Sequence, residues 1–123
     1  MFSTFVAAGF PSPAEDYMEG KLDLNAYLVK NPSATFFVRA AGDSMLGAGI
    51  HAGDILIVDR SLEVVNKKIV VAVVNGEFTV KRIFIADGGI VLMPENKKYK
   101  SLHIKKEMNF EVWGVVKSVI HFL

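Results

Sequence analysis

Two short segments carry residue types that can do covalent chemistry together. Ser44 lies in a glycine-rich stretch at residues 42–45 (GDSM), and Lys81 lies in an apolar stretch at residues 78–82 (FTVKR). A serine hydroxyl is a weak nucleophile until a base takes its proton, and an uncharged lysine can be that base. Together the two segments suggest a serine nucleophile activated by a neutral lysine, in a peptidase with its own N-terminus as a candidate substrate.

The surroundings of Lys81 follow from a predicted hairpin. Asn75-Gly76 separates two strand patterns, residues 69–74 and 77–85, and is the preferred type I′ turn. A two-residue loop pairs Val74 with Glu77, so Lys81 is expected to share a face with four uncharged or apolar residues: Val70, Ala72, Thr79 and Ile83. Burial there disfavours the ammonium form and would make Lys81 a usable base. The alternative is a lysine at a sheet edge, with its stem packed and its charged end in water.

The turn around Ser44 is suited to a nucleophile. Glycines lie on both sides of it, at Gly42 and Gly47, and allow a sharp turn and the close approach of another backbone. Such a turn can aim consecutive N–H groups at one point, as an oxyanion hole requires. The alternative is an ordinary strand-to-loop turn in which Ser44 is a local cap.

The other candidate residues give weaker signals. His51, His103 and His121 are isolated and lack metal-ligand spacing, so they are expected at the surface or half-buried, with no metal site. Nothing supports a serine–histidine–aspartate triad. Asp54 and Asp59 flank a strand and are expected to face turns or solvent, which argues against a catalytic pair of carboxylates.

A basic stretch surrounds Tyr99. It is expected to be a solvated loop and edge, although contact with DNA or an acidic partner is the alternative. Trp113 is expected in the core rather than in a site. The stretch consists of Lys97, Lys98, Lys100, Lys105 and Lys106.

Composition limits the classes of protein that the chain can belong to. With 123 residues, 51% of them hydrophobic, it can build one domain around one core. A formal net charge of +1 gives no general reason to expect strong binding to nucleic acid. The absence of cysteine excludes disulfides and thiolate metal sites and fits a cytoplasmic protein. No apolar run reaches the roughly 18 residues of a membrane span, and the N-terminus lacks the basic start of a secretory signal.

The pattern along the chain is mainly β. Residues 1–11 are read as an extended arm, and Ser12 caps a short helix that ends near Gly20. Asp23 caps a second short helix, which Asn31-Pro32 stops. Strands follow, and the strand at 54–59 is wholly apolar between its aspartates and is expected to be covered on both faces. The expected strands are 35–40, 54–59, 69–74, 77–85, 90–93 and 111–120.

Several segments of the chain resemble those of a known family. Residues 32–45, 49–59 and 76–82 look like the active-site segments of the LexA-type self-cleaving serine peptidases, and the 37-residue separation of Ser44 and Lys81 is what that family uses. Residues 8–17 (AGFPSPAEDY) are similar to the cleavage region of the UmuD-like SOS mutagenesis proteins within it. The resemblance covers almost the whole chain.

The resemblance implies a fold and a site. The fold would be a LexA/UmuD-type peptidase domain of twisted antiparallel sheets with one or two short N-terminal helices, usually a homodimer. Ser44 would be the nucleophile and Lys81 the general base, and the backbone N–H groups of Asp43 and Ser44 would form the oxyanion hole. The bond cut would be Ala8-Gly9. This divides the chain into an arm (1–8), an extended arm with short helices (9–34) and a β-rich peptidase domain (35–123).

The resemblance also implies partners. Cleavage would be provoked by the RecA filament on single-stranded DNA, and the trimmed product would join a UmuC-type Y-family polymerase as an accessory subunit in translesion synthesis. No cofactor, metal, membrane or sequence-specific DNA contact is expected, and the expected location is the cytoplasm.

The arm departs from the family pattern. Only eight residues precede Gly9, whereas UmuD proteins generally carry a longer arm. The chain could therefore be a short, trimmed, phage-borne or plasmid-borne relative that needs no activation or cuts only in trans.

One alternative function is a non-proteolytic module that mimics the processed form and binds the polymerase and the RecA filament. Another is a C-terminal fragment of a LexA-type or phage repressor. The chain carries no helix-turn-helix domain, so a LexA-type repressor is expected only if the chain is such a fragment. Signal peptidases use a similar serine and lysine, but they need a membrane anchor.

Overall fold

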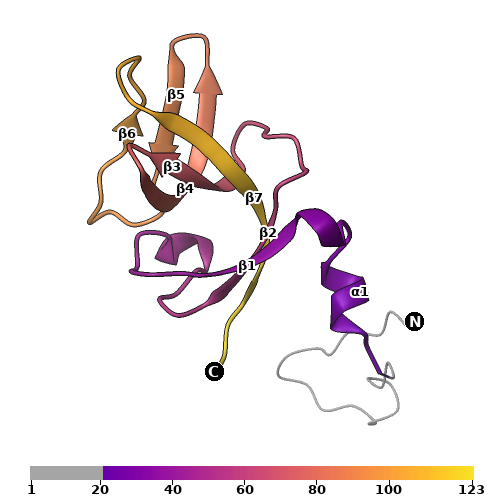
Figure 1. Cartoon of the computed structure of the whole chain (residues 1–123). Coiled ribbons are helices and arrows are strands. Elements are labelled where there is room, and N and C mark those ends of the chain that lie inside the picture. The colour runs from indigo at the N-terminus through magenta and orange to yellow at the C-terminus, as the bar shows by residue number, and fades with distance from the viewer. Residues whose placement is uncertain (1–20) are drawn as a thin grey trace.

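A single seven-stranded antiparallel sheet dominates the computed structural model, which describes residues 21–123. Its order is β1-β2-β7-β3-β4-β5-β6, and every neighbouring pair is antiparallel (Figure 1). The predicted mainly β class is therefore confirmed. The strands are β1 (Thr35–Arg39), β2 (Ile55–Asp59), β3 (Ile69–Val74), β4 (Glu77–Ala86), β5 (Gly89–Met93), β6 (Leu102–His103) and β7 (Phe110–Ile120).

The long strand β7 joins two parts of the sheet. Its C-terminal half pairs with β2, and its N-terminal half pairs with β3. In Figure 1 it runs diagonally between β1 and β2 on one side and β3 to β6 on the other. Gly114 permits a close approach at the crossing, because a Cβ there would lie 2.6 Å from Val58 Cγ1. The register shifts by one residue of β7 at each junction, at Lys117 beside β2 and at Trp113 beside β3, as β-bulges do.

The core lies on both sides of β3. Val71 packs into a cluster with residues of β2 and the Ser44 turn, whereas Val70 and Ala72 pack into a second cluster with β4 and β5. Successive side chains of a strand point to opposite faces, so β3 serves both clusters. Strand β2 is almost wholly buried, as its apolar sequence predicts.

The β3–β4 hairpin has the predicted geometry. Asn75 and Gly76 have φ values of 49° and 84°, the two positive values that a type I′ turn requires. Val70 pairs with Lys81, as counted from the turn. On its other side β4 pairs with β5 only from Arg82 onward, so residues 77–81 have one edge that no described strand covers.

Short helices precede and interrupt the strands. Helix α1 (Leu24–Leu28) begins at the predicted cap, where the Asp23 side chain accepts a hydrogen bond from the Ala26 N–H at 3.3 Å. One 3₁₀ turn, Pro32–Ala34, leads into β1, and a second, Leu46–Ala48, follows Ser44.

The short strand β6 was not predicted. The predicted arm, the helix from Ser12 to Gly20 and the Ala8-Gly9 bond lie outside the described residues.

Asp54 and Asp59 were expected to face turns or solvent, and the structure shows that they face the adjoining turns and are shielded from solvent. They are 4% and 0% exposed. Asp59 accepts hydrogen bonds from the Asn31 side chain and from both the backbone and the hydroxyl of Ser61. A buried carboxylate is stable when its oxygens accept enough hydrogen bonds.

Among the described helices, none is long and apolar enough to cross a membrane.

Candidate active site

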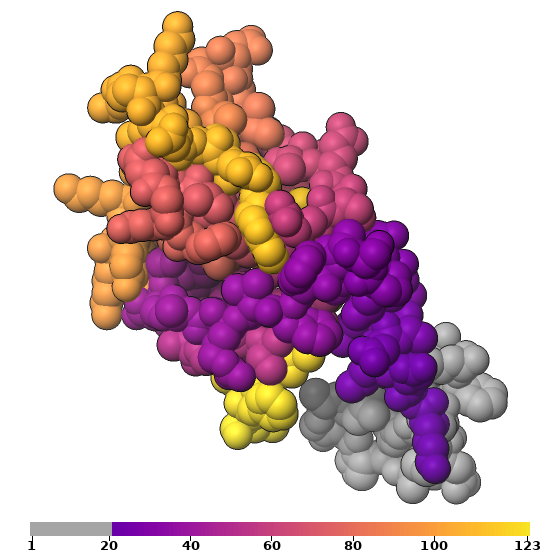
Figure 2. All heavy atoms as spheres, viewed as in Figure 1, coloured from indigo at the N-terminus to yellow at the C-terminus, as the bar shows by residue number. Residues whose placement is uncertain are grey.

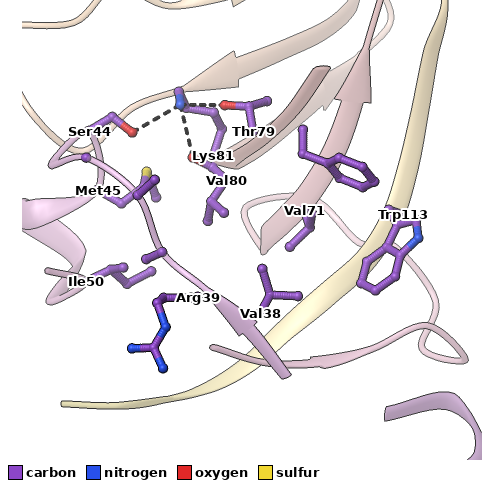
Figure 3. Close-up of a pocket in the computed structure, with 14 residues that line it drawn as sticks. Val38, Arg39, Ser44, Met45, Ile50, Val71, Thr79, Val80, Lys81 and Trp113 are labelled. Carbon is purple, nitrogen blue, oxygen red and sulfur yellow. Dashed lines mark hydrogen bonds between the residues drawn. The ribbon is translucent and has the colours of Figure 1, made fainter. Parts of the chain in front are cut away.

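Ser44 and Lys81 meet at the edge of the sheet. Lys81 Nζ lies 3.1 Å from Ser44 Oγ, and it also contacts Thr79 Oγ1 at 2.7 Å and the Val80 carbonyl oxygen at 3.1 Å (Figure 3). A nucleophile and a base must lie within about 2.6–3.2 Å of each other for direct proton transfer. The contact distance therefore suits transfer of the hydroxyl proton of Ser44 to Lys81.

The environment of Lys81 makes its neutral form more accessible than that of an ordinary lysine. The side chain is half-buried, and burial lowers the pKa of Lys81 below the ordinary lysine value of 10.5. Within residues 21–123 no carboxylate lies close enough to form an ion pair with it. Two oxygens, those of Val80 and Thr79, can accept the two N–H groups of a neutral amine. The lone pair of Nζ is then available for the Ser44 hydroxyl.

The hairpin explains why Lys81 is partly desolvated. Its cross-strand partner Val70 is fully buried, and Ala72 and Ile83 nearby are also buried. Thr79 lies two residues earlier on the same face of β4, which is why its hydroxyl reaches Nζ. The observed register therefore gives Lys81 the neighbours that were predicted from the hairpin.

Ser44 is held in its turn by the loop that follows β5. The Glu95 N–H donates to the Ser44 carbonyl at 2.8 Å, and the Gly47 N–H donates to the Glu95 carbonyl at 2.7 Å. A Cβ on Gly47 would lie only 2.6 Å from that carbonyl oxygen, so the close approach depends on glycine. Gly42 has a φ of 74°, which places the turn before Ser44 in a conformation that favours glycine.

Three side chains brace the same turn. Asn96 Nδ2 donates to the Asp43 carbonyl at 2.8 Å, and Tyr99 donates its hydroxyl to Asp43 Oδ1 at 2.5 Å. The carboxylate of Asp43 raises the pKa of Tyr99 through this hydrogen bond and through its charge. Arg82 Nε donates to Glu95 Oε1 at 2.6 Å. Sequence reasoning missed these contacts, because Asn96 and Tyr99 in a loop and Arg82 in β4 meet the Ser44 turn and its supporting loop only in the folded chain.

The proposed oxyanion donors are free in the described part of the chain. Within residues 21–123, the backbone N–H groups of Asp43 and Ser44 donate to no acceptor. Their carbonyl oxygens, by contrast, are both bonded to the loop at residues 95–96. The turn is therefore fixed through its carbonyl groups, which leaves both donors available for a ligand.

An apolar pocket of about 470 Å³ opens beside Ser44 and Lys81 (Figure 3). Trp113 was predicted to be core, and it packs against the core cluster that contains Val71. It is only half-buried, however, and also lines this pocket together with Phe78, which it meets edge-on at 6.0 Å. Such a lining suits apolar side chains of a bound peptide. The other lining residues are Val38, Arg39, Ala40, Ala41, Gly42, Ser44, Met45, Ile50, Val71, Thr79, Val80 and Lys81.

The three histidines and the lysines of the basic stretch make no contact with the side chains of Ser44 and Lys81 in the described part of the chain. The prediction that all three histidines are isolated was wrong, because the rings of His51 and His121 stack at 4.4 Å and both contact Asp54. These residues are brought together by the pairing of β2 with β7, which their spacing in the sequence does not reveal. His103 on β6 is exposed, as expected. The five lysines of the basic stretch are also exposed, as expected of a solvated loop.

The family match places the chain in the class of self-cleaving serine peptidases. The chain belongs to the Peptidase S24-like family, which matches residues 1–117. It is 46% identical over 121 residues to Protein SamA of Salmonella typhimurium, a match that spans 98% of this chain and 84% of that protein. It is 43% identical over 122 residues to Protein ImpA of Shigella flexneri, spanning 98% of this chain and 82% of the relative.

A third relative, Protein MucA of Escherichia coli, is 46% identical over 112 residues, which is 90% of this chain and 76% of that protein. The predicted resemblance to UmuD-like SOS mutagenesis proteins is confirmed by these relatives and by the family match.

Proposed function

We propose that Ser44 and Lys81 are the catalytic dyad of this chain and that they cut its own Ala8-Gly9 bond. The observation that carries the proposal is the 3.1 Å contact between Ser44 Oγ and a half-buried Lys81 Nζ. Because burial lowers the pKa of Lys81, a larger share of the amine is neutral at a given pH than for an ordinary lysine. No metal or cofactor is needed for this step.

The chemistry follows the positions of the groups. Lys81 takes the Ser44 hydroxyl proton while Oγ attacks the Ala8 carbonyl carbon, and the resulting oxyanion accepts hydrogen bonds from the N–H groups of Asp43 and Ser44. The bond to Gly9 then breaks, and Lys81 returns the proton to the Gly9 amine. Water, deprotonated by Lys81, hydrolyses the ester between Ser44 and Ala8 and regenerates the dyad.

The arm is proposed to bind as an added strand. Residues 77–81 of β4 have an uncovered edge beside the pocket, and an extended peptide can pair with such an edge through its backbone. The residues at the bond, Ala8 and Gly9, are small, which lets the peptide backbone approach Ser44 closely. Val6 and Phe10 supply apolar side chains that fit the apolar lining.

The proposed biological role follows from the family. The chain is a UmuD-like member of it, so we infer that the trimmed form is an accessory subunit of a UmuC-type Y-family polymerase in translesion synthesis. The proposed trigger is the RecA filament on single-stranded DNA, and the proposed assembly is a homodimer in the cytoplasm. These partners rest on the resemblance, whereas the dyad also rests on geometry.

The test compares intact masses after incubation of the purified chain with activated RecA filament or at alkaline pH. The parent chain is expected to lose residues 1–8, and Ser44→Ala and Lys81→Ala are expected to keep them. Ser101→Ala and Lys106→Ala are the matched controls, because both residues are exposed and lie outside the pocket. Equal loss of the arm in Ser44→Ala would overturn the proposed nucleophile.

A further inference from the structure

A second group of chemically able side chains lies where β2 begins and β7 ends. His121 Nδ1 lies 2.6 Å from Asp54 Oδ1, and His51 Nδ1 lies 3.5 Å from Asp54 Oδ2. The two imidazole rings stack at 4.4 Å with an interplanar angle of 29°. The pairing of Ile55 with Ile120 brings these residues together. One ligand atom from each of the three residues lies within 4.8 Å of the others.

The cluster consists of one buried, hydrogen-bonded carboxylate and two half-exposed imidazole rings. The Asp54 side chain is 3% exposed, and its Oδ2 accepts a hydrogen bond from the His51 backbone at 2.7 Å, which fixes the carboxylate. Burial by itself would raise the pKa of Asp54, but the hydrogen bonds and charges of both histidines outweigh burial and hold it below the ordinary value. The side chains of His51 and His121 are 49% and 42% exposed, so an ion can reach them from solvent.

Two imidazoles and one carboxylate are a donor set for particular ions. Nitrogen ligands select zinc and its neighbours among the transition metals, whereas magnesium and calcium prefer sites made of oxygen. Three protein ligands leave a fourth tetrahedral position for water or another ligand. We propose that His51, Asp54 and His121 form a binding site for a divalent ion of the zinc type.

Binding requires a small local change. An ion with ligands at about 2.0–2.1 Å in a tetrahedral arrangement separates two of its ligand atoms by about 3.3 Å. The ion would thus replace the 2.6 Å hydrogen bond between His121 and Asp54 and widen that contact. Both imidazoles would also turn out of their stacked arrangement. Their exposure permits the turn, and the hydrogen bond from the His51 backbone keeps Asp54 in place.

The proposed ion would link the C-terminal end of β7 to residues 51–54, and residues 53 and 54 are hydrogen-bonded to Ala40, which precedes the Ser44 turn. The Asp54 carbonyl accepts a hydrogen bond from the Ala40 N–H at 2.8 Å, and the Ala40 carbonyl accepts one from Gly53 at 2.8 Å. Beyond His121 the chain projects from the body, with Phe122 77% exposed (Figure 2). Metal binding would therefore hold the C-terminal end of β7 against residues 51–54.

The experiment titrates zinc chloride into the full chain, without an affinity tag and carrying Ser44→Ala so that the arm stays intact. Calorimetry is expected to show one ion per chain and no comparable heat with magnesium chloride. His51→Gln and His121→Gln are each expected to weaken zinc binding by at least about tenfold. His103→Gln is the matched control, because His103 is exposed and lies outside the cluster, and it should bind zinc like the parent.

Thermal unfolding gives a second readout. A ligand that binds only the folded state stabilises it by mass action, so zinc should raise Tm in the parent and in His103→Gln but much less in His51→Gln and His121→Gln. Unchanged affinity in both cluster variants, a loss in His103→Gln equal to theirs, or no zinc binding at millimolar concentration would overturn the proposal. Both cluster residues are half-exposed, and if one variant does not fold the other decides.

Discussion

Lys81 Nζ lies 3.1 Å from Ser44 Oγ, and the two residues are connected by a short path through the loop after β5. Arg82, the neighbour of Lys81, binds the Glu95 side chain at 2.6 Å, and the Glu95 backbone donates to the Ser44 carbonyl at 2.8 Å. The same loop therefore contacts both the strand that carries the proposed base and the turn that carries the proposed nucleophile. Such support from both sides limits changes in the distance between them.

Thr79 is expected to position Lys81. Its hydroxyl lies 2.7 Å from Nζ, and Thr79→Val replaces this partner with a methyl group of similar shape. Self-cleavage should slow by about tenfold, because misplacement of a catalytic group lowers the rate steeply. Thr79→Ser keeps a hydroxyl and should retain most of the rate. The check is the rate of arm loss by mass spectrometry, and equal rates in both variants would show that the hydroxyl has no such role.

Gly47 is expected to be required for the close contact between the Ser44 turn and Glu95. In Gly47→Ala the new Cβ would lie 2.6 Å from the Glu95 carbonyl oxygen, so one of the two segments must move. We expect a loss of about 1–3 kcal/mol in the free energy of unfolding, together with slower self-cleavage. Urea denaturation and the cleavage rate measure the two effects.

Gly88→Ala is the control for this change. Gly88 lies in the β4–β5 turn without a positive φ, and nothing lies within 4 Å of a Cβ built there. It should unfold and cleave like the parent. If both alanine variants behave alike, the contact at Gly47 is not what holds the turn.

Asp59 is expected to stabilise the fold as an anion. Hydrogen bonds from Asn31 and Ser61 lower the pKa of Asp59 below its ordinary value of 3.8, and they outweigh the opposing effect of burial. Asp59→Asn should cost about 1–3 kcal/mol in the free energy of unfolding at neutral pH, because the new amide cannot accept all of these bonds. Asp87→Asn, in an exposed turn, should cost little.

The sign of the pH dependence follows from the lowered pKa. The contribution of the Asp59 anion is complete above the unfolded-state pKa and is lost as the pH falls through the lower folded-state pKa. The stability difference between the parent and Asp59→Asn should therefore shrink below about pH 4. Urea midpoints from pH 7 down to the acid limit of folding test this expectation, and a difference that grows with acidity would contradict it.

Local signals in the sequence were enough to predict the hairpin. Asn75-Gly76 defines the turn, and the alternation of side chains then fixes the partner of Lys81. The cap of α1 at Asp23 could also be predicted, because a cap depends only on neighbouring residues. The contact between Lys81 and Ser44 was different. It is made across 37 residues: the residue types suggested the pair, and the family resemblance then supported it through the separation of the two residues.

Contacts between distant segments explain what could not be predicted. Asp54 and Asp59 are polar residues at the ends of a strand, and only their partners in the folded chain make burial possible. The stacking of His51 and His121 depends on the pairing of β2 with β7. Trp113 packs against the core as its size predicts, but its other role, as a wall of the pocket, cannot be predicted from residue type alone.

The pH dependence of self-cleavage tests the serine–lysine dyad most directly. The rate of loss of residues 1–8 would be measured by intact mass from about pH 5 to 10, with Ser44→Ala as the blank. Since Lys81 must be neutral to act, the rate should rise with pH and level off, with a midpoint below the ordinary lysine value of 10.5. A rate that stays flat across this range, or full cleavage in Lys81→Ala, would contradict the assignment of Lys81 as the base.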